Sequence, residues 1–213
     1  MMKRVNISVA LLLLSLAILG GCSDKAKDNA VTLLNEHMVL EQKFSGYLKQ
    51  ITQLETKDKQ TYDNILTEGK KDYLNAKSSI SDALQTIEER RSVLAEAQNA
   101  LLAASENMNS LEKEVNRIKS IEESEQGHKL IDLYKSRDEV FINLYNQYMS
   151  GLELDDKLYQ MLNDKSSNLK QINNQVAERN RSFTEVTKLM HEFNQKSQEF
   201  QDGRISFLKQ LGV

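Results

Sequence analysis

The chain of 213 residues contains one cysteine, Cys22, and the residues before it suit one particular reaction. Cys22 follows Leu19-Gly20-Gly21, so an aliphatic residue stands three positions before it and small residues fill the two positions between. Small residues leave the backbone open to a peptidase, and a cysteine at the new N-terminus can form a thioether to diacylglycerol. The spacing therefore predicts cleavage between Gly21 and Cys22 and lipidation of Cys22.

The segment that precedes the cysteine has the features of a secretory leader. Lys3 and Arg4 give it a positive start, and an apolar stretch from Val9 to Leu19 follows, interrupted by Ser15. This stretch is shorter than the roughly 20 apolar residues that a membrane-spanning helix needs. The arrangement resembles the lipobox of bacterial lipoproteins; an ordinary signal peptide with an unrelated cysteine is the alternative.

The lipobox interpretation predicts both domain organisation and location. We expect a lipoprotein signal peptide over residues 1–21, a lipidated tether over 22–29 and a helical coiled-coil bundle domain over 30–213. Two or more acyl chains give a stable anchor to a bilayer, whereas one alone binds marginally. We therefore expect an S-diacylglyceryl Cys22 to hold the protein to the cell membrane, on its extracytoplasmic, cell-wall side.

The remaining reactive side chains do not form a recognisable site. His37, His128 and His191 lie on different segments, and none has a second metal ligand at helical spacing. Adjacent acids such as Asp155 and Asp156 diverge around a helix instead of converging on a substrate. The sequence has no GxGxxG, Walker A or GxSxG motif. We therefore expect no enzymatic activity, no cofactor and no metal site.

The composition favours long helices. The chain has no proline, no tryptophan and 8 glycines, and its aromatic content is 6%. Without proline, nothing interrupts a helix. The sequence lacks the turn residues that a strand-rich fold needs and the cysteines that a disulfide scaffold needs. Loss of Lys3 and Arg4 with the leader leaves 26 basic and 31 acidic side chains. That balance gives no reason to expect nucleic-acid binding.

Apolar residues recur with alternating three- and four-residue steps, the pattern of a coiled coil, in four segments. The segments run over Leu33–Ile65, Tyr73–Ile118, Leu130–Leu162 and Leu169–Leu211. These heptads predict an all-α fold, and short connections between the segments would make neighbouring helices antiparallel. The fold would be an elongated antiparallel helical bundle with coiled-coil packing and three to four long helices. The second helix, of about 50 residues, would run roughly 75 Å and leave part of its length unpaired or packed on a partner.

Three short breaks would separate these helices. The first is at Gly69, the second spans Glu122–His128 with Gly127 inside it, and the third spans Asn163–Asn168. Ser166 or Ser167 would cap the last helix, because a serine hydroxyl can accept a bond from a free amide of the first turn.

Polar residues interrupt the apolar seams at His37, Asp58, Arg91, Arg137, Asp155 and Arg179. They could form a buried ion-pair network or a binding groove. Polar seam residues more often set the register of a coiled coil and stay partly exposed, and we favour that interpretation. The run from Glu88 to Arg91 is interpreted as local ion pairing along one helix.

Tyrosines crowd the third segment at Tyr134, Tyr145, Tyr148 and Tyr159. Aromatic side chains on a helix could stack on sugar rings. More often they belong to the core and keep the hydroxyl at its edge, and we favour that position here.

Several short motifs resemble the YkyA-like family of cell-wall-binding lipoproteins from Gram-positive bacteria. The resemblance is clearest in Leu144-Tyr145-Asn146-Gln147-Tyr148 and in the run Leu152-Glu153-Leu154-Asp155-Asp156-Lys157-Leu158-Tyr159-Gln160-Met161-Leu162. A weaker likeness lies in Leu40-Glu41-Gln42-Lys43-Phe44. The resemblance implies a membrane-anchored helical protein that faces the wall, with peptidoglycan, teichoic acid or an envelope protein as partner. The alternative is a structural or adaptor protein that binds another envelope protein through its long helices.

Overall fold

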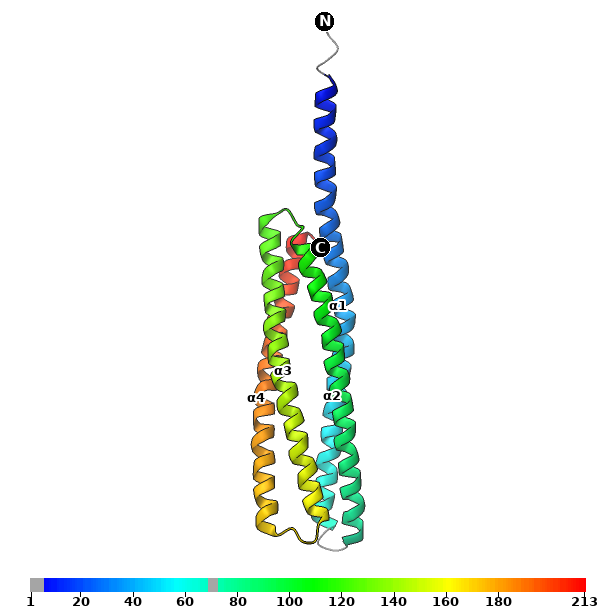
Figure 1. The fold of residues 1–213 in the computed structure, drawn as a ribbon, viewed down its shortest axis with the longest axis vertical. Helices are drawn as coiled ribbons and strands as arrows, with labels where there is room; N and C mark the ends of the chain where they lie inside the picture. The colour runs from blue at the N-terminus through cyan, green and yellow to red at the C-terminus, as the bar shows by residue number, and fades with distance from the viewer. Residues whose placement is uncertain (1–5, 69–72) are drawn as a thin grey trace.

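The structure is a computed structural model, which describes the backbone of residues 6–68 and 73–213 and the side chains of 25–67 and 76–213. Four helices follow one another: α1 (Asn6–Glu68), α2 (Tyr73–Val115), α3 (Ile121–Asn163) and α4 (Leu169–Leu211). They run along one long axis with alternating direction, and α1 extends past the other three at its N-terminal end (Figure 1). The predicted all-α, elongated antiparallel bundle is confirmed.

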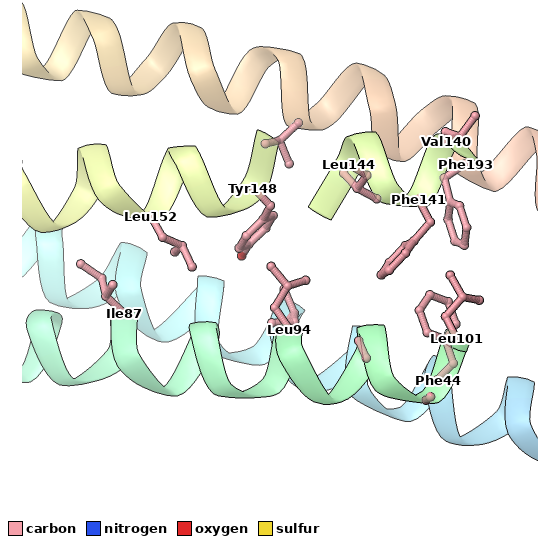
Figure 2. Packing of buried hydrophobic residues seen from close by; sticks show 14 of the residues in the cluster. Phe44, Ile87, Leu94, Leu101, Val140, Phe141, Leu144, Tyr148, Leu152 and Phe193 are labelled. Atoms are coloured by element: carbon pink, nitrogen blue, oxygen red, sulfur yellow. The ribbon is translucent and has the colours of Figure 1, made fainter. Parts of the chain in front are cut away.

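The helices pack as two hairpins that share one core. α1 packs on α2, α3 packs on α4, and α2 joins the two hairpins through α3, whereas α1 and α4 approach each other much less within the described residues. Figure 2 shows Leu94 of α2 and Tyr148 of α3 pointing into the space between the hairpins. In the same core, Phe44 meets Phe141 and Phe193 edge to face, and the rings of Phe141 and Phe193 are tilted against each other. Buried residues of α2 recur every seventh position, which is the heptad period of coiled-coil packing.

The second helix is not longer than its neighbours, contrary to the sequence prediction. α2, α3 and α4 each have 43 residues. α2 ends at Val115, and α3 starts after Ser120, whose hydroxyl accepts a bond from the Glu123 amide. The chain thus turns several residues before the expected break, and α2 has no unpaired overhang.

Gly127 lies inside α3 and not in a turn, which corrects the second predicted break. A Cβ at this position would come within 2.7 Å of a Val115 side-chain carbon and 3.1 Å of the Phe207 ring. The glycine is therefore needed for close approach of three helices, and its helical backbone conformation is ordinary.

The last helix is capped by Asn168, and neither Ser166 nor Ser167 caps it. The Asn168 side chain accepts a bond from the Gln171 amide, and the Gln171 side chain accepts one from the Asn168 amide, which completes a capping box. Both serine hydroxyls bond the Asp164 carboxylate instead. The predicted break at Gly69 lies outside the described residues.

Packing begins earlier than the expected boundary at residue 30. Ala26 and Ala30 are fully buried in the core, and Lys27 lies 2.7 Å from the Glu123 carboxylate. The C-terminal part of the expected tether therefore belongs to the bundle. No helix in the described part of the chain is long and apolar enough to cross a membrane.

Candidate functional site

A charged layer crosses the interior of the bundle. It lies about midway between the cluster of Phe44, Phe141 and Phe193 and the end of the bundle at which α4 begins. We call it the Arg90 layer; each helix contributes one member, and these are Asp58, Arg90, Asp155 and Arg179. The Arg90 Nη1 atom lies 3.1 Å from an Asp155 oxygen and 3.5 Å from an Asp58 oxygen. Arg179 donates to both aspartates as well. The four charges sum to zero, as a buried ionic cluster requires.

Two tyrosines complete the layer. The Tyr148 hydroxyl accepts bonds from Nε and Nη2 of Arg90, at 3.0 and 2.8 Å, and donates to Glu55 at 2.8 Å. The Tyr159 hydroxyl donates to Asp58 at 2.8 Å. Burial raises the pKa of both tyrosines, so they remain protonated donors.

The charge states inside the layer follow from burial and pairing. Burial raises the pKa of Asp155, and the Arg179 charge opposes that rise. Burial also disfavours the charge on Arg90, but Tyr148 and Asp155 outweigh it, so the pKa of Arg90 is raised. The arginines therefore stay cationic, and Asp155 is the member most sensitive to loss of a partner.

The Arg90 layer corrects the prediction that the polar seam residues set the register and stay partly exposed. Asp58 and Asp155, 97 positions apart in the sequence, meet at Arg90. They are also sealed: 4% of the Asp58 side chain and 0% of the Asp155 side chain are exposed. The layer is therefore a buried ion-pair network and not a partly exposed set of register residues. Because no substrate can reach the two acids, they do not form a glycosidase-like pair.

The arginine at this seam is Arg90, whereas the sequence analysis assigned Arg91. Arg91 is 24% exposed and lies 3.3 Å from Glu88, so the local ion pairing expected for that run involves Arg91. Arg90 occupies one position of a heptad series whose other members, Ala76, Ala83, Ala97 and Ala104, are small and buried. A seam assigned only from large apolar residues omits these alanines and therefore also omits Arg90.

A second charged group lies nearer the N-terminal end of α1 and is called the Arg137 layer. Its members are Glu41, Arg137, Ser197 and His37. Arg137 binds both Glu41 oxygens at 2.7 Å and donates to Ser197 at 2.9 Å. His37 Nε2 lies 3.3 Å from Glu41, with its ring edge-on to Phe200. Burial acts to raise the pKa of Glu41, but His37 and Arg137 outweigh it, so the pKa is lowered and Glu41 is ionised.

The tyrosines of α3 belong to the core, as expected. Tyr134, Tyr148 and Tyr159 are at most 2% exposed, and Tyr145 packs partly buried against the same core. They are therefore not available as an exposed platform for sugar rings.

An open groove lies between α1 and α4, next to the Arg137 layer. Its volume is 450 Å³, within the range of ligand sites, which begins at roughly 300 Å³. α1 lines it with Met38, Glu41, Gln42, Phe44, Ser45 and Leu48. α4 lines it with Phe193, Asn194, Ser197, Gln201 and Arg204, and Arg137 of α3 closes the floor.

The groove combines an apolar floor with a polar rim. Phe44 and Phe193 are 2% exposed, whereas the amides of Gln42 and Asn194 lie on exposed positions. Amide and hydroxyl groups around an apolar base suit a ligand rich in hydroxyl, amide or acetamido groups. The groove could not be predicted from the sequence, because its polar residues occupy ordinary outward-facing helix positions with no motif. Only His37 and Arg137 of the Arg137 layer had been singled out.

The other predicted site residues remain separate. The Cys22 side chain lies outside the described residues, so cleavage between Gly21 and Cys22 and lipidation of Cys22 stay predictions. His128 and His191 lie on α3 and α4, and no group of three or more possible metal ligands occurs within 25–67 and 76–213.

Comparison with known proteins agrees with this architecture. A conserved protein of unknown function from Staphylococcus aureus shares the fold: the TM-score is 0.73 at 12% identity, over 83% of this chain and 88% of that one. A lipoprotein of Bacillus subtilis strain 168, named "Uncharacterized lipoprotein YkyA", is 22% identical over 203 residues, 95% of this chain and 91% of its own. Residues 25–210 match the YkyA family, described as "Putative cell-wall binding lipoprotein". The chain therefore belongs to the YkyA family.

Proposed function

We propose that this protein is a non-enzymatic lipoprotein, anchored to the outer face of the cytoplasmic membrane through Cys22, whose bundle binds the cell wall. The groove between α1 and α4 is the binding site. The observation that carries this proposal is the groove itself, an opening in the described part of the bundle, whereas Asp155 and Arg137 of the two charged layers are enclosed. The family description, a cell-wall binding lipoprotein, supports the same assignment.

The geometry of α1 supports the anchored arrangement. The helix is continuous over Asn6–Glu68, and the core already includes Ala26. At 1.5 Å per residue, the 19 residues from Cys22 to Glu41 span about 28 Å. An anchor at Cys22 would therefore hold the bundle upright on the bilayer, with the groove roughly 28 Å above its attachment point.

A purely binding role fits the chemistry of the described side chains. The converging acids are sealed in the Arg90 layer, and Glu41 in the groove is held by both arms of Arg137. Neither arrangement leaves a carboxylate free to act as a general acid or base.

The adaptor alternative was suggested by a predicted second helix longer than its neighbours. The unpaired part of that helix would have been the surface that binds another envelope protein. Because α2 has the same 43 residues as α3 and α4, that overhang does not exist.

The test is retention on cell walls. The full chain, produced in Gram-positive cells and purified in detergent, would be sedimented with purified walls that retain both peptidoglycan and teichoic acid. We expect saturable retention in the pellet. Retention no greater than that of an unrelated helical bundle of similar net charge would refute the proposal.

A further inference from the structure

Arg204 is a cation with no ion-pair partner among the side chains of 25–67 and 76–213. It lines the groove from α4, and its Nε atom is inaccessible to solvent and has no hydrogen-bond partner within the described residues. A buried donor that remains unpaired lowers stability, so such groups are uncommon, and unlike His37 and Arg91, Arg204 has no ion-pair partner among the described residues either. The two Nη atoms of Arg204 also make no hydrogen bond or ion pair among the described residues, but they are not enclosed, so a ligand that enters the groove can bind the guanidinium through them.

The other charged groups of the groove neutralise each other. Arg137 binds both oxygens of Glu41 and also donates to Ser197, so none of its three nitrogens is left over. The groove therefore presents one uncompensated positive charge, that of Arg204, among neutral amides and hydroxyls. This balance selects for a ligand with a single negative group.

A carboxylate suits this site better than a chain of phosphates. The planar fork of arginine matches a carboxylate with two parallel bonds, as Arg137 does with Glu41 in the same groove. A polymer with one phosphate in each unit would need several cations, but the groove offers one. The chain without its leader, with 26 basic and 31 acidic side chains, would repel a polymer that carries a phosphate in every unit further.

We propose that the wall polymer bound in the groove is peptidoglycan, and that Arg204 binds one of its free carboxylates. This inference rests on the proposed function. The amides of Gln42, Asn194 and Gln201 would exchange hydrogen bonds with the acetamido and peptide groups beside that carboxylate. Phe44 and Phe193 would contact its apolar carbons at the base of the groove.

Two changes test this assignment, one to each side of the proposed contact between Arg204 and the carboxylate. One is Arg204→Gln in the full chain, with Arg117→Gln as the control. Arg117 pairs with Glu114 outside the groove, so the control makes the same change in net charge. The other is amidation of the carboxyl groups of peptidoglycan from which teichoic acid has been stripped. Binding of each protein to amidated and untreated peptidoglycan is measured by sedimentation, with circular dichroism to compare helix content.

We expect Arg204→Gln to weaken binding to untreated peptidoglycan about tenfold or more, the effect of losing a charge-assisted contact. Arg117→Gln should bind as the natural chain does. Amidation should weaken binding of the natural chain by a similar factor and leave the Arg204→Gln variant almost unchanged, because the contact is already lost.

Other outcomes separate this inference from the proposed function. Equal sensitivity of both proteins to amidation, or undiminished binding by Arg204→Gln, would overturn the role of Arg204. If the variant does not fold, the amidation arm still decides with the natural chain: unchanged binding would refute the carboxylate. Retention on purified teichoic acid alone would overturn the peptidoglycan assignment but leave wall binding standing. Retention on neither polymer would refute both.

Discussion

Replacing Arg90 by leucine should be among the most damaging single substitutions in the bundle. Arg90 is 2% exposed and donates to Tyr148, Asp58 and Asp155. Its loss leaves two buried aspartates with one arginine, Arg179, and thus one uncompensated negative charge. Breaking a buried ion pair from one side costs about 3–5 kcal/mol.

That cost is large against the whole stability of a domain, which is about 5–15 kcal/mol. With a urea dependence of roughly 3 kcal/mol per molar, the unfolding midpoint should fall by about 1 M or more. The assay is urea unfolding of the chain from Ser23, followed by circular dichroism. The matched control is Arg91→Leu, since Arg91 has one partner, the exposed Glu88, and should cost no more than about 1 kcal/mol.

Two further measurements examine the mechanism. Adding Asp155→Asn to Arg90→Leu should recover part of the loss, because Asp58 and Arg179 then balance. The cost of Arg90→Leu should also shrink as the pH falls from 7 toward 5. The folded pKa of Asp155 lies above its ordinary value of 3.8 and rises further without Arg90, so the folded state takes up the proton first and gains stability. Equal costs for the two arginine variants, or no recovery in the double variant, would refute this account.

Three other predictions follow from the anchor, the packing and the Arg137 layer. Cys22→Ala should give an unprocessed or released protein; a variant still recovered from membranes in cleaved, lipidated form would show that the lipobox interpretation is wrong. Gly127→Ala should destabilise the bundle by about 1–3 kcal/mol in urea unfolding, because the methyl group meets a valine side chain of α2. Gly46→Ala, in open space on α1, should instead stabilise by about 0.5–1 kcal/mol; the opposite order would contradict the packing. Stability from the Glu41–Arg137 pair should be present above Glu41's ordinary pKa of 4.5 and decline as the pH falls below it; Glu41→Gln should remove this acid-dependent part of the unfolding free energy, and an unchanged pH profile would refute the pairing.

Much of the fold can be predicted because it is encoded locally. The absence of proline and the heptad spacing fix long helices and identify their inward faces, and short connections fix their antiparallel order. The motif that ends in Cys22 is equally local, since it needs only adjacent residues. The errors occurred at helix ends and at Gly127, where contacts between helices, and not the sequence nearby, decide the structure.

The sequence by itself determined that the protein is a bundle of long heptad helices, and it predicts lipidation of Cys22 from adjacent residues that resemble a lipobox. The tertiary structure decided which polar residues meet. A heptad shows which face of a helix turns inward, but it does not show the level along the axis at which charges on other helices lie. Asp58 and Arg179, 121 positions apart, pair because the bundle places them at one level. Likewise, Arg204 lies on a groove only because α1 and α4 pack little against each other, and no pattern within either helix encodes their separation.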